Sequence, residues 1–242
     1  MGRHTARSAR LRPAVASIGG VTMIGARGLL IAAEGLDGSG KSAGLDALGR
    51  WLERKGRRVH LVPWERSRQV ARATAAPRGR QVLTPRVAAL MAAADAADRL
   101  AREVRGPIQR GDVVLADRYA WTAVAREIAR GLEPQWASAL YRFAPRPDLV
   151  LFHRQERGAA LARALATRPP SLGAEAVGVA YADFLERLMA AYDWLLSGLS
   201  NDPWSVSVLV LDPTTMPSVR EAAVHDTIRP MLEGRSELAA GA

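Results

Sequence analysis

The segment from residue 35 to residue 42 constrains the fold of this chain most strongly, because it follows the spacing G-x-x-x-x-G-K-[ST]. An apolar run of strand length, residues 28–34, precedes it, and leucines recur at helical spacing over residues 42–55 after it. A strand before and a helix after are the context in which this motif binds phosphate. The motif residues are Gly35, Leu36, Asp37, Gly38, Ser39, Gly40, Lys41 and Ser42.

The residue types in this segment suit a nucleotide. Its glycines let the backbone bend around an anion, and the following helix adds the positive end of its dipole. We expect residues 35–42 to bind ATP, with Lys41 reaching the β- and γ-phosphates and Ser42 ligating Mg²⁺. A glycine-rich turn that binds nothing is the alternative. The chain's only lysines are Lys41 and Lys55, so a chance match to the full motif is rare.

Strand-length apolar runs alternate with helical patterns along the rest of the chain. Strands separated by helices imply a parallel sheet with right-handed crossovers. We therefore predict an α/β fold of the P-loop NTPase type, with a five-stranded parallel sheet and helices on both faces. Strands are expected at residues 28–34, 58–63, 112–117, 147–152 and 205–211, and helices at 42–55, 85–109, 120–130, 134–143, 157–166, 173–197 and 216–233.

Residues 1–26 differ in composition from the remainder. No acidic residue precedes Glu34, and the stretch is basic and rich in Gly, Ser and Ala. We expect a disordered basic leader at 1–26 and one folded domain at 27–242. The leader shares its composition with organelle transit peptides. The alternative that we favour is that translation starts at Met23.

Composition narrows the location and the partners. The chain has no cysteine, which excludes disulfides and thiolate zinc sites, and no apolar stretch near the roughly 20 residues of a membrane span. A cysteine-free chain suits a reducing cytosol, so we expect a cytoplasmic protein that does not enter a membrane. The net charge is +10, but no helix carries a dense basic face. We expect the arginines to grip a small-molecule nucleotide and not a nucleic acid.

A second polar group, Asp117-Arg118-Tyr119, follows the third predicted strand. In an open parallel sheet the carboxyl ends of the strands face the ligand crevice. Asp117 can therefore hold the water shell of Mg²⁺, and Arg118 is well placed for a phosphate. The alternative is that Asp117 only caps the next helix.

Four segments together resemble the thymidylate kinase family in identity and order. The resemblance is close over about residues 27–165 and holds only in outline for the C-terminal third. It implies a P-loop kinase domain that uses ATP and Mg²⁺ to phosphorylate a nucleoside monophosphate, most simply dTMP to dTDP; we also expect a homodimer. The segments are Glu34–Ser42, Ala97-Asp98-Arg99, Gly111–Tyr119 and Pro147-Asp148-Leu149-Val150.

The resemblance also implies roles for individual residues. Lys41, Asp37 and Arg118 are expected to be catalytic: Asp37 resembles the loop carboxylate that faces the acceptor sugar, and Arg118 the arginine that grips the acceptor phosphate. Arg99 resembles the arginine that borders the acceptor base. Ser42 and Asp117 resemble the residues at the metal.

The family pattern is broken around the acceptor base. The R-E-P segment after the second strand is replaced by Trp64-Glu65-Arg66-Ser67, where Arg66 is a nearby substitute. Asp95 stands in place of a stacking aromatic residue, Ala123 in place of a base-contacting asparagine, and Arg126 in place of a tyrosine at the sugar. These departures leave open a kinase for a different small acceptor, or a non-catalytic nucleotide-binding protein.

A lid is expected at about residues 154–172. Arg154, Arg157, Arg163 and Arg168 lie in or beside a loop with Pro169 and Pro170, which suits a segment that closes over phosphates. The alternative is that these arginines coat a solvated helix. We expect His60 and His153, both in predicted strands, to be packed and not catalytic.

Truncation of residues 1–22 tests the leader. Nothing in this segment can pack, so its removal should leave both the melting temperature and the activity nearly unchanged. Thermal melts and steady-state rates of the truncated and full-length proteins measure this. A large loss of melting temperature would show that the leader docks on the domain.

Overall fold

The computed structural model describes most of the chain from Arg27 onward. The predicted leader at residues 1–26, Arg66 and most of the predicted lid lie outside the described residues. The described residues are 27–64, 67, 70, 83–156, 158–159, 162, 181–198 and 206–240.

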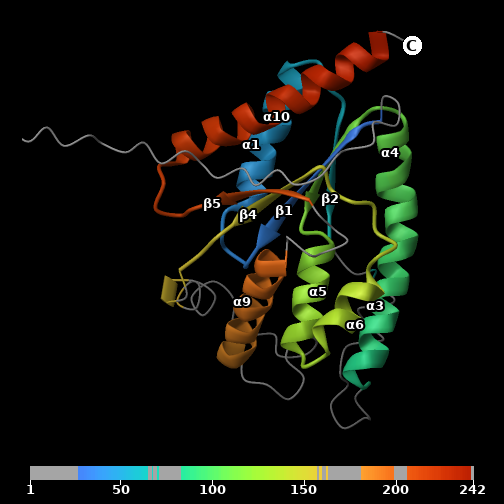
Figure 1. The fold of residues 1–242 in the computed structure, drawn as a ribbon, viewed down its shortest axis with the longest axis vertical. Helices are drawn as coiled ribbons and strands as arrows, with labels where there is room; N and C mark the ends of the chain where they lie inside the picture. Colours follow the sequence, from blue (N-terminus) through green and yellow to red (C-terminus); the bar gives the residue numbers. More distant parts are fainter. Residues whose placement is uncertain are drawn as a thin grey trace, which may run out of the picture.

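A sheet of five parallel strands forms the centre of the molecule, in the order β2-β3-β1-β4-β5 (Figure 1). This confirms the predicted parallel sheet and its number of strands. The central strand β1 is buried along its whole length, as expected for a continuous apolar run covered on both faces. The strands are β1 (Leu29–Gly35), β2 (Val59–Pro63), β3 (Val113–Asp117), β4 (Leu149–His153) and β5 (Ser207–Leu211).

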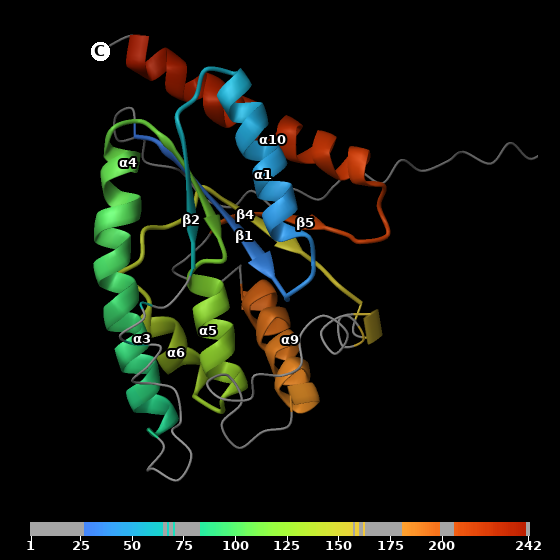
Figure 2. The same cartoon turned by 180° about the vertical axis from the view of Figure 1, so that it is seen from behind.

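Helices cover both faces of the sheet (Figures 1 and 2). Leu29 and Ile31 of β1 belong to an apolar cluster with residues of α1 and α10, whereas Leu30 and Ala32 belong to a cluster with residues of α3, α5 and α9. Successive side chains of a strand point to opposite faces, so an apolar run builds a core on each side. The helices are α1 (Lys41–Arg54), α3 (Pro85–Leu100), α5 (Ala120–Ala129), α6 (Pro134–Leu140), α9 (Tyr181–Ser197) and α10 (Pro217–Ala240).

The long helix expected at residues 85–109 is not regular throughout. After α3 the chain forms a π-helical turn, η1 (Ala101–Arg105), and then the short helix α4 (Gly106–Gln109). Pro107 has no N–H to donate, and its ring crowds the carbonyl one turn earlier. The wider π turn just before it accommodates this proline.

The last helix is longer than predicted. It was expected to end at residue 233 but continues to Ala240, with Pro230 inside it. The stretch after Gly234 contains Glu, Leu and Ala, which are strong helix formers and outweigh the glycine. The helix predicted at residues 157–166 lies mostly outside the described residues.

The carboxyl ends of β1, β3 and β4 meet at one edge of the sheet. In the strand register Ala33 pairs with Asp117, and Gly35 pairs with His153. The loop after β1 therefore begins beside the ends of its neighbouring strands. This is the edge at which open parallel sheets bind their ligands.

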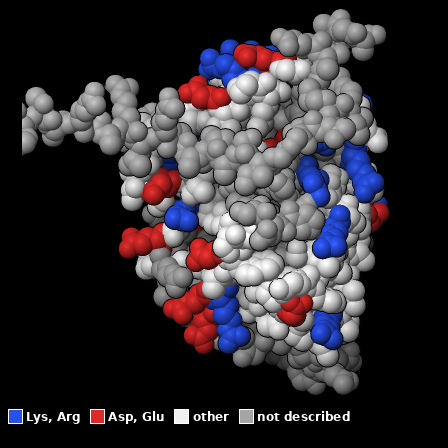
Figure 3. All heavy atoms as spheres, in the orientation of Figure 1, with Lys and Arg blue, Asp and Glu red and all other residues white. Residues whose placement is uncertain are grey.

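Charged side chains are unevenly distributed over the described surface. On the face shown in Figure 3, basic side chains stand apart from one another near the edge where α3 and α4 lie, and acidic side chains gather toward α9. Within the described part of the chain, no helix has both the length and the apolar character that a bilayer crossing requires.

Candidate active site

The loop between β1 and α1 has the backbone of an anion cradle. Gly35, Gly38 and Gly40 have φ values of 131, 73 and 87°, a region that side chains other than glycine rarely adopt. A Cβ on Gly35 would lie 2.5 Å from the carbonyl oxygen of His153. No side chain caps the N-terminus of α1, so its first N–H groups are available to an anion.

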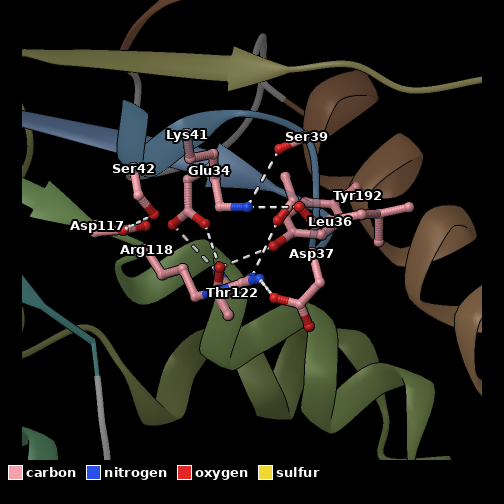
Figure 4. A network of polar contacts seen from close by, with 11 residues as sticks. Glu34, Leu36, Asp37, Ser39, Lys41, Ser42, Asp117, Arg118, Thr122 and Tyr192 are labelled. Atoms are coloured by element: carbon pink, nitrogen blue, oxygen red, sulfur yellow. Dashed lines mark hydrogen bonds and ion pairs between the residues drawn. The ribbon is translucent and has the colours of Figure 1, made fainter. Parts of the chain in front are cut away.

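Lys41 lies inside this loop and is only 4% exposed. Its Nζ donates to the carbonyl oxygen of Leu36 at 2.5 Å and to Ser39 Oγ at 3.2 Å (Figure 4). Burial and the nearby positive charge of Arg118 lower the pKa of Lys41 to about 8. A phosphate brought into the loop would offset both effects.

Ser42 and Asp117 meet across the end of the sheet. The Ser42 hydroxyl donates to Asp117 Oδ2 at 2.5 Å (Figure 4). A hydroxyl and a carboxylate oxygen are ligand types that Mg²⁺ accepts, directly or through its waters. The donor set therefore fits this ion. Elsewhere in the described residues, no group of three or more His, Asp or Glu could hold a metal.

Arg118 links the end of β3 to the loop. Its backbone is left-handed, with φ 68°, and its N–H donates to the carbonyl of Ala33. Its guanidinium donates to the carbonyl of Gly35 at 3.0 Å and forms an ion pair with Asp37. Burial raises the pKa of Asp37, but the charges of Arg118, Arg126 and Lys41 outweigh burial and lower it.

Glu34 is a site residue whose role was not predicted from the sequence. It is 1% exposed, and burial raises its pKa. It accepts hydrogen bonds from the N–H groups of Tyr119 and Thr122 at 3.1 and 3.2 Å, and from Thr122 Oγ1 at 2.5 Å (Figure 4). The Tyr192 hydroxyl from α9 lies 2.8 Å from Thr122 Oγ1.

This carboxylate caps a helix from outside it. No side chain of its own caps the N-terminus of α5, and Glu34 accepts from its first N–H groups instead. The signal in the sequence was a carboxylate at the end of an otherwise apolar strand. A charge at such a position is buried and needs partners.

A pocket opens between β2, α3 and α5. Two of the predicted substrate-binding arginines, Arg99 and Arg126, line it, together with Asp95. Arg118 does not line this pocket but binds Asp37, whose pKa Arg126 also lowers. The complete lining is Val62, Pro63, Trp64, Ala92, Asp95, Ala96, Arg99, Leu100, Glu103, Ala123, Arg126, Glu127 and Tyr141.

Comparison with known proteins identifies a family for this chain. A family model described as thymidylate kinase matches residues 33–197. Probable thymidylate kinase 2 of Saccharolobus solfataricus is 32% identical over 184 residues, which cover 72% of this chain and 86% of that protein. The chain belongs to the thymidylate kinase family. It is therefore a nucleoside monophosphate kinase by family, as the sequence predicted.

Other thymidylate kinases match this chain over a shorter region. A probable thymidylate kinase of Thermococcus gammatolerans is 35% identical over 133 residues, which cover 51% of this chain and 64% of that protein. A thymidylate kinase of Xanthomonas campestris pv. campestris is 36% identical over 132 residues, which cover 51% of this chain and 55% of that protein.

Asp95 accepts a backbone hydrogen bond in this kinase. Its Oδ2 accepts the backbone N–H of Ser67 at 2.9 Å, so it anchors the segment that replaces the usual phosphate-binding one. Trp64, which begins that segment, lies edge-on to Tyr119 with ring centroids 5.4 Å apart. Asp95, which lines the pocket, therefore ties Ser67 to α3.

Arg99 is held firmly at the pocket. Its guanidinium donates to both carboxylate oxygens of Glu103, at 3.1 and 2.9 Å, and to the carbonyl of Pro63 at 2.8 Å. An Arg side chain is a planar fork of five donors, so these bonds fix its orientation.

Two histidines of this kinase, His60 and His153, lie in β2 and β4. His60 Nε2 lies 2.8 Å from Asp112 Oδ2. Burial and Lys41 lower the pKa of His153 to about 4, so His153 is neutral near pH 7. Of the predicted lid arginines, Arg154 is exposed, and Arg157, Arg163 and Arg168 lie outside the described residues.

Lys41→Met tests the burial of the loop lysine in the ligand-free kinase. The pKa of Lys41 is about 8 in the folded protein, against an ordinary value of 10.5. Between pH 8 and pH 10.5, Lys41 therefore carries a proton in the unfolded chain that it has lost in the folded protein. Wild-type stability relative to Lys41→Met should therefore rise from pH 8 to pH 10.5, by about 2–3 kcal/mol. Thermal melts of both proteins across this range measure the difference.

Thermal melts of both proteins with ATP added provide the control. ATP should raise the melting temperature of the wild type and have little effect on Lys41→Met, because the variant lacks the ammonium that reaches the phosphates. A stability difference that stays flat with pH would contradict the buried ammonium.

Proposed function

We propose that this kinase transfers the γ-phosphoryl group of ATP to dTMP, giving dTDP and ADP. The observation that carries the proposal is the ion pair of Asp37, in the phosphate loop, with Arg118 at the end of β3. Asp37 belongs to the loop, pairs with Arg118 and has its pKa lowered by Arg126 of the pocket. A donor phosphate in the loop and an acceptor phosphate at Arg118 would lie next to each other.

The acceptor needs no general base in this reaction. The second pKa of a phosphate monoester is about 6, so the attacking oxygen already carries charge near neutral pH. The protein has to hold the donor and acceptor in line and to neutralise charge on the transferring group. Lys41 would do this for the β- and γ-phosphates and Arg118 for the acceptor phosphate.

Arg118 can take this role while keeping its present bonds. Its guanidinium has five N–H donors, and the bonds to Gly35 and Asp37 orient it without using all of them. Asp37 is proposed to face the acceptor sugar and to hold Arg118 in place. Charge-assisted bonds from a pre-oriented guanidinium are among the strongest contacts to phosphate.

Mg²⁺ is proposed as the cofactor that accompanies ATP. Ser42 and Asp117 would hold it, because their oxygens already meet at the end of the sheet. When bound, it would neutralise part of the charge on the phosphates of ATP.

The remaining assignments extend the same proposal. Arg99 would border the acceptor base and Arg126 the sugar, since both line the pocket. Arg66 and a lid at residues 154–172 are proposed from the sequence alone. So are a homodimer and a cytoplasmic location, which suit an enzyme of nucleotide synthesis. Neither the family match nor the relatives favour another acceptor.

A panel of acceptors tests the function. ADP release from ATP and Mg²⁺ should have its highest kcat/KM with dTMP among dTMP, dUMP, UMP, dCMP and AMP. Because a guanidinium can hydrogen-bond a 2′-hydroxyl, Arg126 should make discrimination between dUMP and UMP weaker than in Arg126→Tyr. ADP release no faster than with ATP alone, for every acceptor, would refute the proposal.

Arg118→Ala in the same assay locates the acceptor phosphate. A charged hydrogen bond contributes about 1.5–3 kcal/mol, so the KM for dTMP should rise at least about tenfold while the KM for ATP stays close to the wild-type value. Arg102→Ala is the matched control, because Arg102 is exposed and paired with Asp98 on the surface of the π turn and α3. Equal effects of the two variants would contradict the assignment of Arg118.

A further inference from the structure

Tyr192 is a buried tyrosine that reaches the site from α9. It is 2% exposed, and its ring lies beside that of Phe152 in β4, with centroids 5.4 Å apart. Its hydroxyl lies 2.8 Å from Thr122 Oγ1, and it contacts no other hydrogen-bond partner among the described residues (Figure 4). The packing therefore fixes the ring and aims the hydroxyl at α5.

The hydrogen atoms of this network can be placed by counting donors and acceptors. A buried phenol needs an acceptor for its proton, so the Tyr192 hydroxyl donates to Thr122 Oγ1. A threonine hydroxyl has a single proton, which Thr122 then donates to Glu34 Oε2 at 2.5 Å. The other carboxylate oxygen accepts the N–H groups of Tyr119 and Thr122. A protonated Glu34 would leave one proton of this network without an acceptor.

The direction of these bonds favours the ionised form of Glu34. Burial raises the pKa of this carboxyl, whereas the hydrogen bonds from Thr122 and the charges of Arg118 and Lys41 lower it. Every donor in the network points at the carboxylate, and hydrogen bonds to the charged form stabilise that form. Tyr192 polarises the Thr122 hydroxyl and so strengthens its bond to Glu34.

Glu34 in turn fixes the backbone around Arg118. Its carboxylate accepts the N–H of Tyr119, the residue that follows Arg118 in the chain. Arg118 itself donates its N–H to the carbonyl of Ala33 at 2.9 Å and its guanidinium to the carbonyl of Gly35 at 3.0 Å. Ala33 and Gly35 flank Glu34, so a displaced carboxylate would disturb the left-handed backbone at Arg118 and the direction of its guanidinium.

We propose that Tyr192 is a positioning residue for phosphoryl transfer: through Thr122 and Glu34, its hydroxyl keeps the arginine of the acceptor site in place. This inference rests on the proposed function, because it concerns the arginine that would bind the acceptor phosphate. The alternative is that the hydroxyl only finds a partner in Thr122 and that Tyr192 serves the fold through its ring.

Tyr192→Phe tests the proposal, because it removes the hydroxyl and keeps the ring. The kcat/KM for dTMP should fall about three- to tenfold, the factor that a neutral hydrogen bond supplies, while the KM for ATP stays within about twofold. Thr227→Val is the matched control, because it removes a hydroxyl that donates to the carbonyl of Ala223 in α10, on the opposite face of the sheet. It should leave both constants within about twofold of the wild type.

Two further comparisons test the route of the effect. Thr122→Val also breaks the network, whereas Thr122→Ser keeps a hydroxyl and should therefore retain more of the kcat/KM for dTMP. In an Arg118→Ala background, Tyr192→Phe should lower kcat/KM by less than about twofold further, because its effect passes through this arginine. A general loosening of the fold would instead multiply with the loss from Arg118→Ala.

The carboxyl ¹³C resonance of Glu34 tests the network without any acceptor. It is assigned by its absence from the spectrum of Glu34→Gln. At pH 7 the wild type should show the chemical shift of an ionised carboxylate, because all the donors point at it. The shift of a protonated carboxyl would overturn the inference.

The outcomes separate this inference from the function on which it rests. If the wild type phosphorylates dTMP but Tyr192→Phe behaves as Thr227→Val does, or its loss multiplies with that of Arg118→Ala, Tyr192 only packs and the inference is overturned. If the wild type phosphorylates no acceptor, the proposed function fails, whereas the resonance of Glu34 still decides whether the network holds a charged carboxylate.

Discussion

The buried carboxylate of Glu34 is the constraint on which the site depends. It ends the central strand of the sheet and accepts the first N–H groups of α5, which no side chain of that helix caps. Without it, the N–H groups of Tyr119 and Thr122 at the N-terminus of α5 would be buried without this acceptor. The loop that joins β3 to α5 is thereby fixed against β1, and with it Arg118, which adopts a left-handed backbone.

This arrangement brings buried cations and carboxylates close together in the site. Lys41 and Arg118 lie near Glu34, Asp37 and Asp117, and burial opposes the charged form of Lys41 until an anion arrives. Phosphates entering the loop would find donors already oriented, so little reorganisation is needed when charge develops on the transferring group. The rigidity comes from the sheet and the flanking helices, because the loop begins and ends on them.

The sequence predicted the parts of this molecule that local pattern determines. The G-x-x-x-x-G-K-[ST] spacing, the apolar strands and the helices between them are local, and the predicted five-stranded parallel sheet was confirmed. The role of Glu34 was missed because its partners Tyr119 and Thr122 are far away in the chain. The π turn before Pro107 is a backbone adjustment that a periodicity does not encode. The extension of α10 past residue 233 follows from helix formers beyond Gly234, where the apolar periodicity had ended.

The lining of the pocket between β2, α3 and α5 could not be predicted from local sequence pattern either. The sequence marked Asp95 and Ala123 as departures from the family but could not show that Asp95 anchors Ser67 or that Glu127 is buried beside them. Both facts depend on how α3, α5 and the segment after β2 pack together. The lining of this pocket is therefore determined by tertiary packing and not by a local motif.

The central claim is that the phosphate loop and this pocket form one continuous site for donor and acceptor. Calorimetric titration with adenosine and deoxythymidine joined through a polyphosphate chain tests it most directly. One continuous site predicts a Kd at least about a hundredfold below that of ATP or dTMP alone, because the second contact becomes intramolecular. Lys41→Ala and Arg99→Ala should each weaken the linked compound. A Kd equal to that of ATP, unaffected by Arg99→Ala, would show that the pocket is not the acceptor site.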